Sequence, residues 1–166
     1  MLAVLEKNAV LTAEGKFHDY GFFVEAVQFI RNYADKFHHA KEEDILFEAL
    51  VANGMPRENS PVAAMLMEHD AGRNFVCQME EAAKRAIDGV PNQNETIAES
   101  ALGYVELLRG HIEREDGILY PLAERVIPEE MRATINEGYR NAEAQADKGL
   151  EAHYRSIVEK YEAVAK

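Results

Sequence analysis

Two stretches of the sequence share one pattern of residues that can bind a metal ion. The stretch that begins at His38 and the one that begins at His111 both read His-x-x-x-Glu-acid-x-Ile-Leu-aromatic when aligned without gaps. In a helix, a spacing of four residues places the imidazole and the carboxylate of each stretch on one face, one turn apart. The carboxylates are those of Glu42 and Glu115. Such pairs on facing helices commonly build a two-metal site in the core of a helical bundle.

The expected burial of the two carboxylates separates this pattern from an ordinary surface pair, which stabilises a helix by roughly 0.2–0.5 kcal/mol. At roughly 100° per residue, Glu42 and Glu115 each fall in the middle of an apolar stripe. The stripe around Glu115 consists of Ala101, Tyr104, Leu108, Ile112, Ile118 and Leu119. A carboxylate in such a stripe is costly unless it is paired or bound to a metal. Nitrogen and oxygen donors without a thiolate suit iron, manganese or zinc.

A third histidine, His69, is also expected to face the core. The stripe on its own helix is apolar or small, and consists of Val62, Met65, Gly72, Val76 and Met79. A lone histidine on such a face is more often an ordinary core residue, but here two other helices already present His and Glu inward. The predicted metal ligands are therefore His38, Glu42, His69, His111 and Glu115.

A second pair, His39 and Glu43, has the same spacing as His38 and Glu42. Upstream of His39, its stripe holds the polar residues Gln28, Asn32 and Asp35, which indicates the solvent side. The alignment with the second stretch also selects His38 and Glu42. We expect His39 and Glu43 to lie directly behind the ligands or on the surface, and their replacement of His38 and Glu42 as ligands stays open.

The elements that position these residues are all predicted to be helices. Apolar residues recur at three- and four-residue steps, and Gly and Pro are sparse. We predict helices over about 2–12, 19–51, 61–87 and 96–120, with Pro121 and Pro128 bending or ending the last. The tail from 129 to 166 reads as one or two amphipathic helices broken around 147–149. The fold class is thus all-α, an up-down four-helix bundle over 1–128 with an extra C-terminal helical segment over 129–166 that packs on the bundle or on a partner subunit.

Composition restricts the class of partner. The 166 residues carry 18 Lys and Arg against 30 Asp and Glu, a net charge of −12, which disfavours duplex DNA and anionic membrane surfaces. No run approaches the ~20 apolar residues of a spanning helix, and the N-terminus lacks the features of a signal peptide. The single cysteine, Cys77, excludes an internal disulfide and is expected to be a packed thiol. These features predict a soluble, cytoplasmic protein.

The motifs together resemble the hemerythrin-like, or HHE cation-binding, family. The matching residues are 38–47, the segment Glu68-His69-Asp70-Ala71-Gly72-Arg73, and 111–121, and they follow the family's order over residues 30 to 121. The resemblance implies a four-helix bundle with a non-haem di-iron centre. It also implies that Glu42 and Glu115 bridge the two metals and that His38, His69 and His111 are terminal ligands.

The resemblance leaves one ligand unassigned. The first helix of the family carries a further ligand histidine, and in this chain that position would fall before Met1. His18 is the only histidine upstream of His38, and a continuous helix from 19 to 38 would hold the two about 30 Å apart, so we exclude it. Either the first helix is truncated at its N-terminus, or one metal has an incomplete shell, or a partner chain supplies the group. Two iron ions are expected, or one if the shell is incomplete.

Three functions remain open at this point. The leading one is a di-iron protein that binds or senses O2 or NO or handles iron, acting alone or as a homodimer. An enzyme of the same site class, reducing peroxide or NO or donating iron for cluster repair, is the alternative, with Tyr104 as the candidate redox-active or proton-donating side chain. A helical interaction module without metal is the second alternative.

Overall fold

The computed structural model describes residues 1–145 and 150–164, and within these ranges every regular element is a helix. The all-α prediction is therefore confirmed. The elements are α1 Leu2–Ala13, α2 Tyr20–Phe29, η1 Ile30–His39, η2 Glu42–Phe47, α3 Glu48–Ala52, α4 Pro61–Ile87, α5 Asn94–Arg114, η3 Glu115–Leu119, α6 Tyr120–Val126, α7 Glu129–Gln145 and α8 Leu150–Val164. The predicted break around 147–149 lies outside the described residues.

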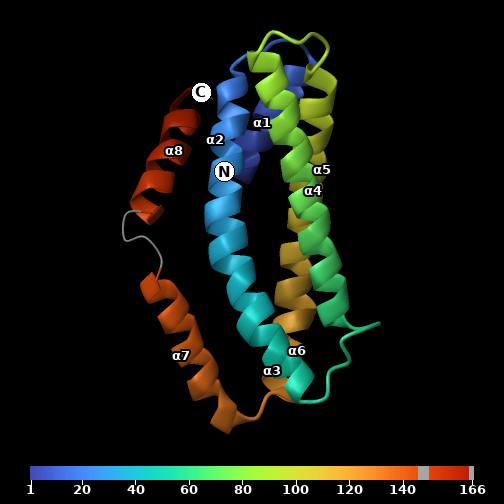
Figure 1. The fold of residues 1–166 in the computed structure, drawn as a ribbon, viewed down its shortest axis with the longest axis vertical. Coiled ribbons are helices and arrows are strands. Elements are labelled where there is room, and N and C mark those ends of the chain that lie inside the picture. Colours follow the sequence, from blue (N-terminus) through green and yellow to red (C-terminus); the bar gives the residue numbers. More distant parts are fainter. Residues whose placement is uncertain (146–149, 165–166) are drawn as a thin grey trace.

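Three long antiparallel helical runs form the body of the molecule (Figure 1). The first comprises α2, η1, η2 and α3, the second is α4, and the third comprises α5, η3 and α6. The helix α4 packs against both α2 and α5, while the shorter α1 packs along α5. In the first and third runs the helix passes from α-helical to π-helical geometry, in which each turn holds more residues.

Local sequence signals account for where most of these runs begin and end. Ser60 caps α4 by accepting a hydrogen bond from the backbone NH of Ala63, and Pro61 occupies the first turn. Gly54 follows α3 with a φ of +97°, a conformation that suits glycine at a helix C-terminus. Pro121 does not end the third run, because it lies in the first turn of α6, where the helix passes from π-helical to α-helical geometry.

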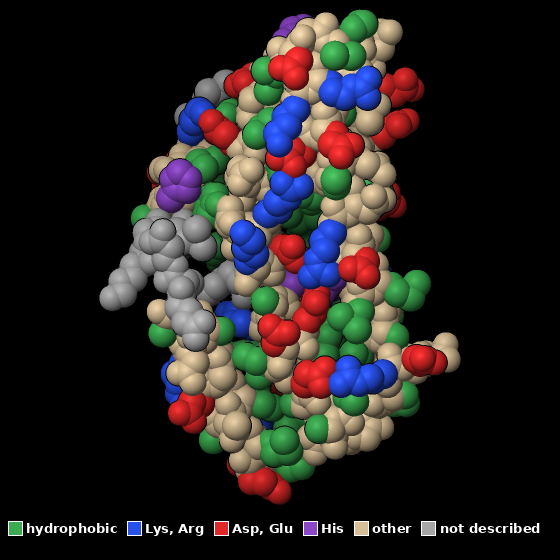
Figure 2. Space-filling view, in the orientation of Figure 1, with side chains coloured by type: hydrophobic (Ala, Val, Ile, Leu, Met, Phe, Trp, Pro, Cys, Tyr) green, Lys and Arg blue, Asp and Glu red, His purple; other side chains and the backbone are tan. Residues whose placement is uncertain are grey.

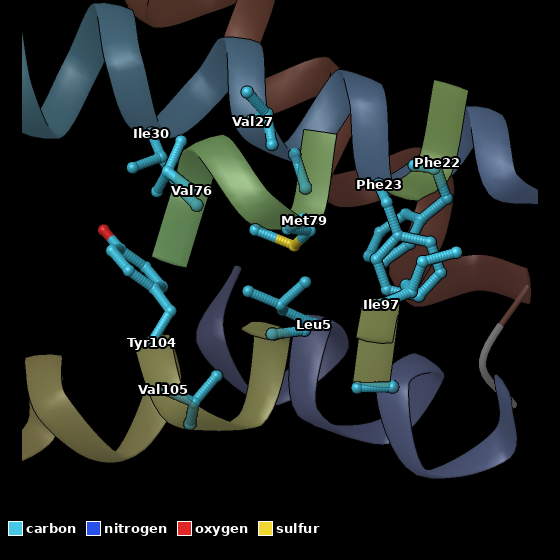
Figure 3. Close-up of a cluster of buried hydrophobic side chains, with 14 of the residues drawn as sticks. Leu5, Phe22, Phe23, Val27, Ile30, Val76, Met79, Ile97, Tyr104 and Val105 are labelled. Carbon is cyan, nitrogen blue, oxygen red and sulfur yellow. The ribbon is translucent and has the colours of Figure 1, made fainter. Parts of the chain in front are cut away.

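The apolar core is divided into two clusters, and the predicted ligands lie between them along each long run. The larger cluster gathers side chains from α1, α2 and the facing parts of α4 and α5, including Leu5, Phe22, Phe23, Met79 and Ile97 (Figure 3). The smaller cluster joins the opposite ends of the three runs and includes Leu46, Leu50, Val62, Met65 and Leu119. The two clusters fix the helices on either side of a polar layer.

The two C-terminal helices lie along the outside of the first run (Figure 1). The helix α7 contacts η2, where Lys41 pairs with Glu143 at 2.9 Å. The helix α8 contacts α1 and packs the ring of Tyr154 edge-on against Phe29. No helix in the described part of the chain has the length and apolarity needed to cross a membrane.

Candidate metal centre

The polar layer is built where α-helical and π-helical segments meet. Glu42 is the first residue of η2, Glu115 is the first residue of η3, and His39 is the last residue of η1. π-Helical turns occur frequently at functional sites. His69 reaches the same layer from the middle of α4, and His111 from the last turn of α5.

Four of these side chains bring one ligand atom each into a small volume. Glu42, His69, His111 and Glu115 each offer one such atom, and the four atoms lie within 4.8 Å of one another. Oε2 of Glu42 is 3.7 Å from Nε2 of His69, and Oε1 of Glu115 is 3.0 Å from Nε2 of His111. The two Nε2 atoms are 3.3 Å apart. The four residues are between 1% and 4% exposed, so the inward placement predicted for the two carboxylates is confirmed. The histidines and carboxylates come from all three long runs.

Two further carboxylates fix the orientation of the two histidines. Nδ1 of His69 lies 2.7 Å from Oε1 of Glu43, and Nδ1 of His111 lies 2.9 Å from Oε2 of Glu68. Because an ionised carboxylate only accepts hydrogen bonds, each Nδ1 carries the proton. A neutral ring then leaves Nε2 with a lone pair, which is the form of histidine that binds a metal.

The inner atoms of the layer are thereby left without donors. Among the described residues, Oε2 of Glu42 and Oε1 of Glu115 are buried and have no hydrogen-bond partner. The Nε2 atoms of His69 and His111 also face each other, at 3.3 Å. Buried acceptors that lack a donor are costly, and a cation between them would satisfy all four at once. Two imidazole nitrogens and two carboxylate oxygens fit iron, manganese or zinc.

A comparison with protein-family models identifies the family. A model described as the hemerythrin HHE cation binding domain matches residues 1–123. The chain belongs to the hemerythrin HHE cation-binding family. This confirms the resemblance inferred from the motifs, and it leaves α7 and α8 outside the matched residues. Neither the curated proteins nor the solved structures contained a match to the chain.

The hemerythrin-type layer contains both members of the His38-His39 pair, in different environments. His38 is half-exposed, with Nε2 at 3.8 Å from Oε2 of Glu42 and 3.6 Å from Oε1 of Glu115. His39 is only 7% exposed, its ring stacks on that of His69 at 3.8 Å, and it forms a second candidate ligand group with His69 and His111. Of the two placements expected for His39, behind the ligands or on the surface, the structure has the first, because η1 rotates the residues at its end relative to an α-helix.

Burial and neighbouring charges shift the pKa values of several groups in the polar layer. Burial and the neighbouring charge of Glu115 raise the pKa of Glu42 to about 7. Burial also acts to raise the pKa of Glu115, but the adjacent rings of His111 and His38 outweigh it and hold that pKa well below its usual range. Burial and the nearby rings of His69 and His38 lower the pKa of His39 to about 3, so His39 is neutral near pH 7.

Two tyrosines approach Glu42 from the side of α6 and α7. The hydroxyl of Tyr120 donates a hydrogen bond of 2.8 Å to Oε1 of Glu42, which leaves Oε2 as the inward oxygen. Tyr139 of α7 lines a cavity of about 330 Å³ together with Tyr120, and burial and the charge of Glu42 raise the pKa of Tyr139 to about 12. The segment outside the family match therefore borders the centre.

The contacts that hold the two histidines, made by glutamates and arginines around them, were not predicted from the sequence. Arg73 donates a hydrogen bond of 2.7 Å to Glu43, and Arg114 pairs with Glu68 at 2.8 Å. The result is two His-Glu-Arg arrangements, one for each histidine. A signal was present in part, because an arginine follows His69 by four residues and another follows His111 by three. The carboxylates are not recognisable in this way, since each comes from a different helix than the histidine it holds.

The other residues singled out from the sequence lie outside the cluster of four ligand atoms. Tyr104 is 3% exposed and lies near His39 and His69, in the wall of one cavity. His18 is exposed in the turn before α2, and His153 is exposed on α8, as expected. Cys77 is exposed rather than packed, because its position on α4 faces solvent, where its thiol lies 3.6 Å from Glu81.

Proposed function

We propose that this chain is a non-haem metal protein of hemerythrin type that holds iron in the polar layer and binds or senses O2 or NO there. The proposed ligands are those predicted from the sequence, His38, Glu42, His69, His111 and Glu115. The observation that carries the proposal is the cluster of four buried ligand atoms, in which the two carboxylate oxygens have no hydrogen-bond partner among the described residues. A site of this composition is unfavourable without a cation.

The two carboxylates support a pair of metals. The oxygens Oε2 of Glu42 and Oε1 of Glu115 lie near His38 and also near the pair formed by His69 and His111. Carboxylates shared by two sets of histidines are the arrangement that di-metal bundles use. The set on the side of His38 has fewer protein donors, which is consistent with the ligand that the sequence left unassigned. We therefore expect two iron ions, with the ion near His38 held more weakly, or one ion if that position does not fill.

Each part of the chain has a separate task in this proposal. Glu43 and Glu68 hold the protons of the histidines on Nδ1, so that Nε2 stays available. Tyr120 fixes one oxygen of Glu42. The two apolar clusters exclude water from the layer on both sides. Bound iron with an open coordination position supplies reversible binding of a diatomic molecule.

The experiment that tests the proposed function is a spectroscopic titration of iron-loaded protein. A visible absorption change that appears with O2 or NO and reverses when the gas is removed supports binding or sensing. Steady consumption of added peroxide or NO over many turnovers would instead support the enzyme of the same site class. An iron-loaded sample that shows neither response contradicts the proposed binding of O2 or NO. Iron storage or donation would then be the remaining role.

The cytoplasmic location and the metal-free interaction module stay untested expectations. The hypothesis of a metal-free module predicts a different result, because without a metal a buried carboxylate only destabilises the fold. Under that hypothesis Glu115→Leu stabilises the fold and changes nothing else. Under the proposed function the same substitution removes bound metal.

A further inference from the structure

A cavity of about 170 Å³ opens beside the candidate metal centre, between the first run, α4 and α5. Its inner wall includes His39 and His69, and its apolar wall includes Ile30 and Val76. Figure 3 shows Tyr104 extending from α5 toward Val76 and Ile30, with its hydroxyl at the far end. Because His69 belongs to the inner cluster, a molecule in this cavity would lie next to the proposed iron ligands.

Two polar groups in the wall of this cavity are buried and make no hydrogen bond within the described part of the chain, although Nδ1 of His39 lies 3.5 Å from Oδ1 of Asp35. The hydroxyl of Tyr104 and both ring nitrogens of His39 make no hydrogen bond with any residue in the ranges 1–145 and 150–164. Tyr104 is 3% exposed and His39 is 7% exposed. A buried hydroxyl that lacks a partner is rare in folded proteins, and in a native structure it points to a water or a ligand. Burial also raises the pKa of Tyr104, so its hydroxyl keeps its proton and acts as a donor.

The rim of the cavity is charged and held in place. Arg73 bridges three elements through Asp35 at 2.8 Å, Glu43 at 2.7 Å and Asp70 at 3.0 Å. Figure 2 shows histidine atoms at mid-height on this face, surrounded by basic and acidic side chains. A fixed rim around a cavity of this volume admits a molecule of only a few heavy atoms.

We propose that this cavity binds a small ligand whose outer atom accepts a hydrogen bond, and that Tyr104 donates that bond and thereby selects the ligand. The class comprises diatomic and linear triatomic molecules, with azide as the probe. The apolar wall disfavours larger polar molecules, and the single donor favours a ligand with a terminal acceptor over one without it. This inference rests on the proposed function, because the ligand lies beside the iron that it would bind.

The inference is tested with iron-loaded full-length protein, by measuring azide affinity and iron content in the same samples. Tyr104→Phe removes only the donor and should raise the azide Kd about tenfold or more, as expected for a hydrogen bond to an anion. Val76→Phe fills the cavity and should abolish azide binding. Both variants should keep the wild-type iron content. Tyr161→Phe, which alters a tyrosine on α8 bonded to Glu25, is the matched control and should leave the azide Kd unchanged.

The outcomes separate this inference from the function on which it rests. Unchanged azide affinity in both Tyr104→Phe and Val76→Phe, with iron retained, overturns the cavity as the ligand site and leaves the metal centre standing. Equal losses of azide affinity in Tyr104→Phe and Tyr161→Phe overturn the role of Tyr104. If the wild-type chain takes up no iron, the proposed function fails and this inference fails with it.

Discussion

Glu68 offers the sharpest test of how the outer carboxylates position the metal ligands. Its two oxygens have separate tasks, since Oε2 accepts from Nδ1 of His111 at 2.9 Å and Oε1 pairs with Arg114 at 2.8 Å. In Glu68→Gln, one oxygen becomes an NH2 group that can only donate. In either orientation of the new amide, its NH2 group therefore faces a donor, which is Nδ1 of His111 in one orientation and Arg114 in the other. We expect His111 to lose its fixed orientation or its Nδ1 proton.

The expected magnitude follows from that single broken contact. Removal of a partner that orients a metal-bound histidine typically costs about 10- to 100-fold in metal affinity, or about 1.4–2.8 kcal/mol. The assay is a competition titration of iron or zinc against a chelator of known affinity. Glu113→Gln is the matched control, because it removes the same charge from an exposed glutamate on the turn of α5 that carries His111.

One pattern of results would refute the reasoning about Glu68. If Glu68→Gln and Glu113→Gln bind the metal equally well and as tightly as the wild type, then His111 is not held by Glu68 in the bound state. A loss of affinity accompanied by unfolding would be recognised by circular dichroism. In that case Glu68→Asp, which keeps the charge and shortens the reach, would be compared at the same temperature.

Three further predictions concern packing, the inner carboxylate and pH. Gly103→Ala should destabilise the fold by about 1–3 kcal/mol, because an added Cβ would lie 2.6 Å from the ring of Phe75. Denaturant unfolding measures the change, and an unchanged midpoint would contradict the close packing of Gly103 against Phe75. Glu115→Leu should abolish metal binding while leaving the metal-free protein at least as stable as the wild type; retained metal, measured by elemental analysis, would contradict the assignment of Glu115. Metal affinity should increase from about pH 6 to about pH 8, because the proton competes with the metal. Glu42, with a pKa of about 7, loses its proton in this range. A chelator competition that gives a flat or falling affinity over this range would contradict the role of Glu42.

Much of the fold follows from local signals in the sequence. The apolar spacing predicted the first long run over 19–51, and the structure has it from Tyr20 to Ala52. The cap at Ser60 and the stop at Gly54 are equally local and were readable. The pairing of α7 with η2 was not predicted in detail, because an amphipathic face does not specify which neighbour it covers.

The candidate site was predictable where burial follows the regular α-helical period. Glu42 and Glu115 are buried as their stripes indicated. The stripe of His39 indicated the solvent side because the sequence pattern assumes an α-helix, whereas the π-helical segment η1 changes which residue faces inward. Glu68 and Glu43 were not recognised as partners of the histidines because each contact crosses between helices. Periodicity along one helix carries no information about such crossings.

The measurement that tests the central claim most directly is the metal content of the folded chain. Protein purified with iron supplied, and then passed through a desalting column, is compared with the double variant Glu42→Gln/Glu115→Gln by elemental analysis. We expect about two iron ions per wild-type chain, or about one if the position near His38 does not fill, and close to none in the variant. A fully folded wild-type chain with close to none would contradict the proposed metal centre.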